Sequence, residues 1–206
     1  MMTFFQLFLC AVLGYLLGNI QSGLIIGRLM NNVDLRKHGS GSSGATNALR
    51  VLGRQEALFT LLGDYCKGLL AVVAGLVIVG QHGGMVAGLF VVAGHIWPVF
   101  FGFQGGKGVA TSLGALTILM PFHMIGMAGV GIAIVFLTKT VSVASLSGAL
   151  VLLISGVITA VIGRDWAQMA FSILMSGLVV YAHRANIDRI FQGKENKLSS
   201  SMFKKK

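Results

Sequence analysis

The most polar stretch of this sequence, residues 35–50, has the residue types that bind a phosphate group. It reads LRKHGSGSSGATNALR, with glycines, hydroxyls and an amide between basic side chains. Small residues let backbone N–H groups converge on an anion, hydroxyl groups add donors, and arginine or lysine supplies the opposite charge. A flexible loop whose basic residues only follow membrane topology would have the same composition.

A second patch, residues 94–108, combines glycines with a single lysine. It reads GHIWPVFFGFQGGKG, and His95 and Pro98 are expected in a spanning segment. The turn Gly105-Gly106-Lys107-Gly108 could wrap an anion beside a point charge. Because Val109 follows Gly108, the stretch lacks the spacing of a nucleotide P-loop, and ATP binding is not indicated. A tight turn with one topological lysine is the alternative interpretation.

The third patch, residues 183–195, reads HRANIDRIFQGKE and follows the last apolar segment. If the helix continues, His183 and Asn186 share one face and could orient a hydroxyl or phosphate and relay a proton. The string His183-x4-Asp188 resembles the signature of another glycerolipid acyltransferase family. Five residues rotate a helical side chain by about 140°, so Asp188 would face away and a His–Asp relay is disfavoured. An interfacial histidine followed by solvated charges remains the alternative.

Two opposite charges lie inside the second apolar segment. Asp64 and Lys67 are three residues apart, so they could form an ion pair that lowers the cost of each charge in a bilayer. They are candidates for supporting the site from behind, and a purely structural pair is the alternative. Cys10 and Cys66 give no disulfide or metal pattern. No metal site is expected.

The hydropathy of the chain indicates a polytopic α-helical membrane protein. Of 206 residues, 55% are hydrophobic and 11% charged, with a mean hydropathy of +0.83, whereas soluble domains have about 25% charged residues. The predicted fold is all-α, a compact bundle of seven transmembrane helices whose glycines allow close helix approach. The first span is expected to break near residues 18–23, and Pro121 marks a turn. The expected spans are residues 4–29, 56–79, 85–101, 107–120, 121–138, 141–163 and 166–183.

The basic residues orient this bundle with its N-terminus outside. They gather in the segments expected inside, whereas the outside loops hold only Arg164. Topology therefore explains most of the net charge of +10, and no nucleic-acid partner is expected. The sequence predicts one integral membrane domain over residues 1–198 and a basic cytoplasmic tail over residues 199–206, with no cleavable signal peptide.

In this order, the polar stretches resemble the acyl-phosphate-dependent glycerol-3-phosphate acyltransferases of bacteria, the PlsY family. The resemblance implies a multi-pass protein of the cytoplasmic (inner) membrane with its active site facing the cytoplasm. It implies acyl transfer from acyl phosphate to the 1-hydroxyl of glycerol 3-phosphate, giving lysophosphatidic acid and inorganic phosphate, the first step of phospholipid biosynthesis. No cofactor is expected. The matching segments are GNIQSGLIIGRL, LRKHGSGSSGATNALR, GDYCKG, GHIWPVFFGFQGGKGVAT and HRANIDRIFQGKE.

Carried over residue by residue, the resemblance implies a set of site residues. Gln21 stands where the family usually has proline, and Ser42 where it often has asparagine. The implied partners are the two substrates, the lipid bilayer and, through functional coupling, the enzyme that produces acyl phosphate. The implied catalytic residues are His183, Asn186, Ser40 and Lys107, and the implied substrate-binding residues are Arg50, Thr46, Asn47, Gly105, Gly106, Gly108 and Glu195.

Three questions stay open at the level of sequence. The proton of the attacking hydroxyl could pass to His183 or to a substrate phosphate, and Ser40 as a covalent acyl carrier is a third option, disfavoured because no base is obviously paired with it. The same basic patches could serve a transporter or binding protein for organic phosphates, although its site should lie near the membrane midplane. An acyltransferase that takes acyl-CoA should need a larger nucleotide-binding surface, which the sequence does not indicate.

Overall fold

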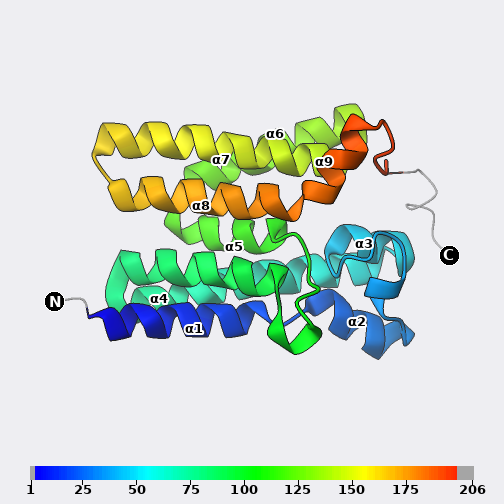
Figure 1. The fold of residues 1–206 in the computed structure, drawn as a ribbon, viewed down its shortest axis with the longest axis horizontal. Coiled ribbons are helices and arrows are strands. Elements are labelled where there is room, and N and C mark those ends of the chain that lie inside the picture. Colours follow the sequence, from blue (N-terminus) through cyan, green and yellow to red (C-terminus); the bar gives the residue numbers. More distant parts are fainter. Residues whose placement is uncertain (1–2, 199–206) are drawn as a thin grey trace.

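The chain folds into a bundle of long helices with a group of short helices at one end (Figure 1). This computed structural model describes residues 3–198, which contain no strand. The basic tail predicted for residues 199–206 lies outside the described residues. The α-helices are α1 (Phe4–Gly18), α2 (Ser22–Asn31), α3 (Ala45–Val51), α4 (Arg54–Ile96), α5 (Val109–Leu119), α6 (Pro121–Thr138), α7 (Val141–Gly163), α8 (Trp166–Ala182) and α9 (Arg184–Phe191), and the 3-10 helices are η1 (Leu35–Lys37) and η2 (Val99–Phe101).

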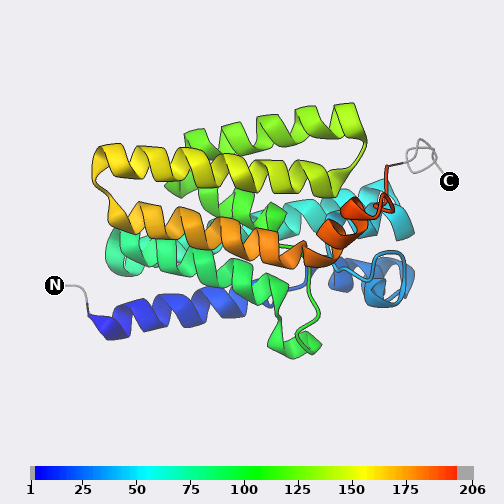
Figure 2. The ribbon, with the colours of Figure 1, turned by 45° about the horizontal axis from the view of Figure 1, so that its top comes forward.

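The helices form two layers with α5 between them. Helices α1 and α4 make one layer, helices α6, α7 and α8 make the other, and α5 packs between them (Figure 1). In a view turned by 45°, α2, α3 and α9 again lie at one end of the bundle (Figure 2). The first polar stretch lies in the loop before α3 and on α3, the second connects α4 to α5, and the third forms α9 and the segment after it. The fold gathers all three at that end.

Helix α4 is two antiparallel arms rather than one rod. Its helical backbone is interrupted at Val79 and at Gly80, which has a φ of +67°. The arms then lie back to back, and a side chain at Gly75 would strike the Gly83 carbonyl. The two spans predicted at residues 56–79 and 85–101 correspond to these arms. The second prediction was too long, because the helix ends at Ile96 and Pro98 begins the 3-10 turn that follows.

The break predicted in the first span is confirmed between α1 and α2. Ending a helix inside an apolar bundle frees carbonyl groups that need donors. The Lys67 ammonium donates to the carbonyls of Gly18 (3.3 Å) and Ile20 (2.6 Å). Gln21, which is fully buried, donates to Gly18 and to the His95 carbonyl, and its own oxygen accepts from Ser43. The amide thus ties the break to the polar loop and to α4.

By length and hydropathy, the described helices include four candidate membrane spans. These are residues 4–31, 54–101, 121–138 and 141–163, and α8 with α9 gives a fifth if the pair, bent by 60°, counts as one span. The segment 54–101 is counted once although its helix is folded into two arms. Helix α5 has only 11 residues, short of the ~20 that a bilayer crossing needs. The seven crossings and the outside N-terminus therefore stay predictions.

Close backbone contact between α1 and the second arm of α4 generates a stability prediction. A Cβ at Gly14 would lie 2.5 Å from the Ala87 carbonyl oxygen, where backbone cannot give way. Overpacking of this kind costs about 1–3 kcal/mol, so Gly14→Val should lower the apparent Tm by roughly 5 °C. Thermal unfolding in one detergent measures this. Gly129→Val on α6, where a Cβ meets nothing within 4 Å, is the matched control and should leave the Tm nearly unchanged. Equal Tm values for both variants would contradict the packing.

Candidate functional site

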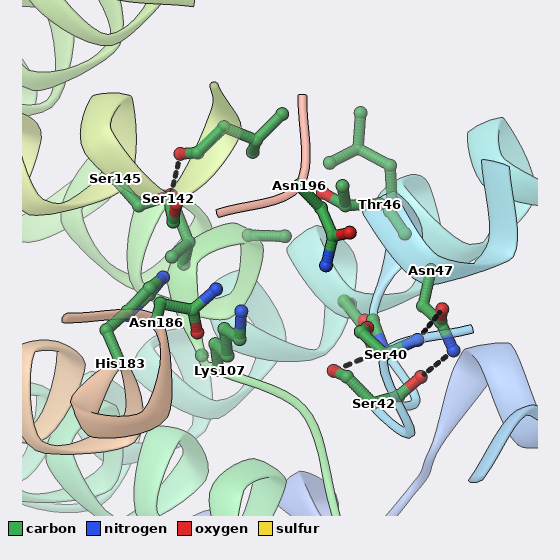
Figure 3. Close-up of a pocket in the computed structure, with 18 of the residues that line it drawn as sticks. Ser40, Ser42, Thr46, Asn47, Lys107, Ser142, Ser145, His183, Asn186 and Asn196 are labelled. Atoms are coloured by element: carbon green, nitrogen blue, oxygen red, sulfur yellow. Dashed lines mark hydrogen bonds between the residues drawn. The ribbon is translucent and has the colours of Figure 1, made fainter. Parts of the chain in front are cut away.

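A pocket of about 190 Å³ lies where the polar loops meet the ends of α7 and α8. Most of its lining is polar, and an apolar part of the lining, called the apolar wall below, includes Leu61, Val109 and Leu113. Figure 3 shows the polar side chains reaching into one space from several separate segments. The polar and charged residues that line it are Ser40, Ser42, Thr46, Asn47, Arg50, Asp64, His95, Lys107, Ser142, Ser145, His183, Asn186, Arg189, Glu195 and Asn196.

Asn47, the second residue after the start of α3, holds the loop of residues 35–44 in shape. Its amide nitrogen lies within 2.8–3.1 Å of the carbonyls of Leu35, His38 and Ser42, and its oxygen accepts from the Ser40 backbone N–H at 2.8 Å (Figure 3). Its polar atoms are therefore committed to the loop. Asn47 lines the pocket and holds the Ser40 backbone in place, and the direct contact with substrate expected from the sequence stays a prediction.

Arg36, from the same polar stretch, is also structural. It forms a salt bridge of 2.7 Å with Asp34 and donates to the Phe101 carbonyl at 3.0 Å. The hydrogen bond from Arg36 lowers the pKa of Asp34 to about 2, despite the opposing effect of burial. Arg36 therefore fastens the loop to η2, and Arg50 is the basic residue of this stretch that lines the pocket.

The glycine turn before α5 contributes Lys107 and Gly108 to the pocket, but Gly105 and Gly106 do not line it. A Cβ on either residue would strike His95, and the Gly106 N–H donates to the His95 carbonyl at 3.1 Å. Gly108 has a φ of +79°, which favours glycine. Gly105 and Gly106 thus let the turn lie against His95, which aims Lys107 into the pocket.

His183 and Asn186 lie on the bend between α8 and α9, and both line the pocket (Figure 3). The His183 Nδ1 lies 2.7 Å from the Val179 carbonyl, which can only accept, so Nδ1 carries the proton and Nε2 has the free lone pair. The two residues lie together as predicted, although the continuous helix expected there is bent by 60°. Asp188 is exposed and does not line the pocket, in agreement with the prediction against a His–Asp relay.

A short segment after α9, residues 194–198, closes one side of the pocket. Glu195 accepts from the Asn186 amide at 2.8 Å and from Arg189 at 2.9 Å. The backbone N–H of Leu198 then donates to the Lys139 carbonyl in the turn between α6 and α7. Burial raises the pKa of Glu195, but the hydrogen bonds that it accepts and the charge of Arg189 together outweigh this effect, so the net shift is downward and the carboxylate stays ionised.

The predicted ion pair beneath the site is confirmed. The Lys67 ammonium lies 2.9 Å from Asp64, and it also lies 2.7 Å from the His95 Nδ1. Lys67 and Asp64 are both almost fully buried. Asp64 and His95 line the pocket and Lys67 does not, and the supporting role expected for the pair stays a prediction.

Several pocket residues were missed by the sequence analysis. Ser142 and Ser145 lie on α7, in a span of high overall hydropathy, and only their spacing on one helical face could have indicated a shared surface. Arg189 and Asn196 were within or beside the third polar stretch but were not selected. Among residues 3–198, no three His, Cys, Asp or Glu side chains cluster closely enough to hold a metal ion.

The sequence of this chain is similar to the sequences of a known enzyme family. A family model described as glycerol-3-phosphate acyltransferase matches residues 8–193. The glycerol-3-phosphate acyltransferase of Thermoanaerobacter sp. strain X514 is 38% identical over 190 residues, covering 92% of this chain and 94% of the relative. That of Syntrophomonas wolfei is 42% identical over 188 residues, covering 91% and 95%.

Two solved structures of PlsY (YgiH), an integral membrane glycerol 3-phosphate acyltransferase, share the fold. The glycerol 3-phosphate form superposes with a TM-score of 0.87 at 33% identity, covering 96% of this chain and 98% of that one. The lysophosphatidic acid form gives a TM-score of 0.82 at 31% identity, covering 95% and 97%.

The environment of Lys107 generates a pH prediction. Burial lowers its pKa from 10.5 to about 8, an effect that Glu195 partly offsets. Its ammonium is therefore present below about pH 8 and is lost above it, so anion binding should weaken as the pH rises. We expect the Kd for glycerol 3-phosphate to increase by up to about tenfold per pH unit above that value, measured by calorimetry from about pH 7 to 9.5.

Lys107→Arg is the matched variant, because a guanidinium keeps its charge throughout this range. Whatever its affinity at neutral pH, its Kd should stay flat between pH 8 and 9.5. A Kd that is independent of pH in the unmodified protein, or the same alkaline rise in both proteins, would show that Lys107 is not the group responsible.

Proposed function

The chain belongs to the glycerol-3-phosphate acyltransferase family, and from this we propose that it takes its acyl group from acyl phosphate. The acceptor would be the 1-hydroxyl of glycerol 3-phosphate, and the products lysophosphatidic acid and inorganic phosphate. The solved relatives support the acceptor and product, since their forms carry glycerol 3-phosphate and lysophosphatidic acid. Acyl phosphate as the donor is the part of this proposal that rests on the pocket.

The observation that carries the choice of donor is the size and charge of the pocket. It measures about 190 Å³ and holds the cationic side chains of Lys107, Arg50 and Arg189 beside an apolar wall. Two small phosphate groups and the start of an acyl chain suit this combination. An acyl-CoA donor would bring a nucleotide and a pantetheine arm several times larger than the glycerol phosphate, which exceed the volume of this pocket.

The reaction needs little covalent chemistry from the protein, because acyl phosphate is already activated. The acceptor oxygen attacks the acyl carbonyl carbon, and the bond between this carbon and the phosphate oxygen breaks. The electron pair leaves with the phosphate. Lys107 and Arg50 would hold the two phosphate groups and neutralise the charge that develops on the leaving group, which is the usual contribution of positioned cations.

The hydroxyl proton has two acceptors in this scheme, His183 and a phosphate oxygen of the substrate. The hydrogen bond from Nδ1 to Val179 favours His183, because it fixes the ring with a lone pair on Nε2. Asn186 is fixed in a complementary way. Its amide nitrogen donates to Glu195, which leaves its oxygen free to accept from the second glycerol hydroxyl, because the single proton of the attacking hydroxyl goes to the base. Glu195 therefore acts through Asn186.

Ser40 fits better as a phosphate ligand than as a covalent acyl carrier. Its hydroxyl lies at the pocket wall with its backbone held by Asn47. A serine nucleophile needs a paired base, and within residues 3–198 no hydrogen bond joins the Ser40 hydroxyl to a histidine or carboxylate. We assign Ser40 and Thr46 to the phosphate groups.

The distribution of charge also suggests a cellular location for the protein. We place the protein in the bacterial cytoplasmic membrane with seven crossings, its N-terminus outside and its pocket at the cytoplasmic face. The asymmetric distribution of lysine and arginine supports this orientation. Acyl phosphate would arrive from the enzyme that makes it, and the apolar wall formed by Leu61, Val109 and Leu113 would receive the acyl chain from the bilayer.

Phosphate release by the purified protein tests the donor directly. With palmitoyl phosphate, release of inorganic phosphate should require glycerol 3-phosphate, and palmitoyl-CoA should give no acylated product. Mass spectrometry of the lipid product checks the position of transfer. Rapid release without an acceptor would indicate a covalent intermediate or hydrolysis. Equal turnover with acyl-CoA would refute the proposed donor, while leaving membership of the family intact.

Single substitutions test the assigned roles. His183→Ala should lower kcat by about 10²–10⁴-fold if the ring takes the proton. Arg50→Lys should mainly raise KM for glycerol 3-phosphate, since lysine cannot offer a bidentate fork to phosphate. The matched control is Asp188→Asn, an exposed position on α9 outside the pocket, which should keep near-normal kinetics. Near-normal turnover of His183→Ala would transfer the role of base to the substrate phosphate.

A further inference from the structure

We propose that a groove on the outer surface of the bundle binds the acyl chain of an anionic phospholipid, with Arg184 binding the phosphate of its head group. The groove lies between the end of α4 and the face of α8 and has a volume of about 470 Å³. It shares no lining residue with the polar pocket, so the inference is independent of the proposed acyl transfer. Its lining residues are Trp97, Ile173, Leu174, Gly177, Leu178 and Tyr181.

The groove, called the lipid groove below, is hollow at Gly177, because glycine has no side chain to fill the space there. A Cβ at Gly177 would meet nothing within 4 Å, whereas Ile173 and Leu174 beside it are 45% and 55% exposed. The walls are entirely hydrocarbon or aromatic. In a membrane-spanning bundle such a surface faces lipid, and a hollow between larger side chains is filled by a chain that can lie along it.

The end of the lipid groove nearest α9 has the residue types that are common at a membrane interface. The rings of Trp97 and Tyr181 pack with centroids 5.7 Å apart, and the Arg184 guanidinium lies 4.7 Å from the centre of the Tyr181 ring. Tryptophan and tyrosine prefer the head-group level, and arginine binds phosphate through several N–H groups. Arg184 is exposed and donates one N–H to the Tyr181 carbonyl at 3.3 Å, so the stacked guanidinium is held at the mouth with N–H groups left to offer.

The length of the groove matches one leaflet. From Ile173 to Tyr181, α8 rises by about 12 Å, close to half of the ~30 Å hydrocarbon core. A phosphate at Arg184 therefore sets its acyl chain at the depth of the groove. The charge of Arg184 selects an anionic lipid over a neutral one, because the positive head group of a zwitterionic lipid competes for the same phosphate.

Trp97 provides a direct reporter, because the chain contains two tryptophans and the second, Trp166, can be replaced. Trp166→Phe protein is reconstituted in phosphatidylcholine vesicles that contain increasing fractions of phosphatidylglycerol or phosphatidylcholine with dibrominated chains. Bromine quenches a tryptophan only at close range. We expect half-maximal quenching of Trp97 at a mole fraction at least threefold lower for the brominated phosphatidylglycerol.

Two variants in this background separate the parts of the site. Arg184→Gln should remove the preference for phosphatidylglycerol and leave quenching by both lipids. Gly177→Leu should fill the hollow and reduce quenching by both, whereas Gly129→Leu, which adds the same bulk at an open position on α6, should have no effect. Identical quenching curves for the two lipids, or no effect of Gly177→Leu, would overturn the proposal. Quenching by a brominated single-chain acyl phosphate at lower mole fraction than either lipid would also overturn it and assign the groove to substrate.

Discussion

The structure depends on one buried ammonium group, that of Lys67. Burying a charge in an apolar bundle costs several kcal/mol unless its hydrogen-bonding groups are all used. Here the ammonium lies beside Asp64 and the His95 ring and donates to carbonyls freed by the break between α1 and α2. It thereby joins the broken first span to both arms of α4. Because His95 supports the glycine turn, the same contact reaches the loop that presents Lys107.

A second network, formed by neutral side chains, holds the opposite wall of the pocket. Gln21, at the break between α1 and α2, accepts a hydrogen bond from Ser43. Asn47 donates to backbone carbonyls of the loop that joins α2 to α3. The flexible backbone that glycine and serine would otherwise give this loop is thus fixed by buried amides. The pocket is shaped by residues that need not touch a ligand, with Lys107, Arg50 and Ser40 left facing it.

Sequence reasoning found the helices well because hydropathy and proline mark their limits. The segments at residues 121–138 and 141–163 coincide with α6 and α7. It predicted the roles of the site residues less well, since a polar residue in a loop can bind a ligand or form hydrogen bonds within the loop. Asn47 and Arg36 turned inward to backbone carbonyls, which composition alone cannot reveal. Ser142 and Ser145 were missed because two hydroxyls hardly change the hydropathy of a long apolar helix.

The segment after α9 has a consequence for handling the protein. Glu195 holds Asn186 at the pocket, and Leu198 is tied to the turn after α6. Residues 194–198 are thus part of the pocket wall, whereas α1 begins at the other end of the bundle (Figure 1). An affinity tag or reporter fused close after residue 198 would pull on the residues that position the ligand. A fusion ahead of α1 would leave them untouched, so the N-terminus is the better attachment point for purification or surface immobilisation.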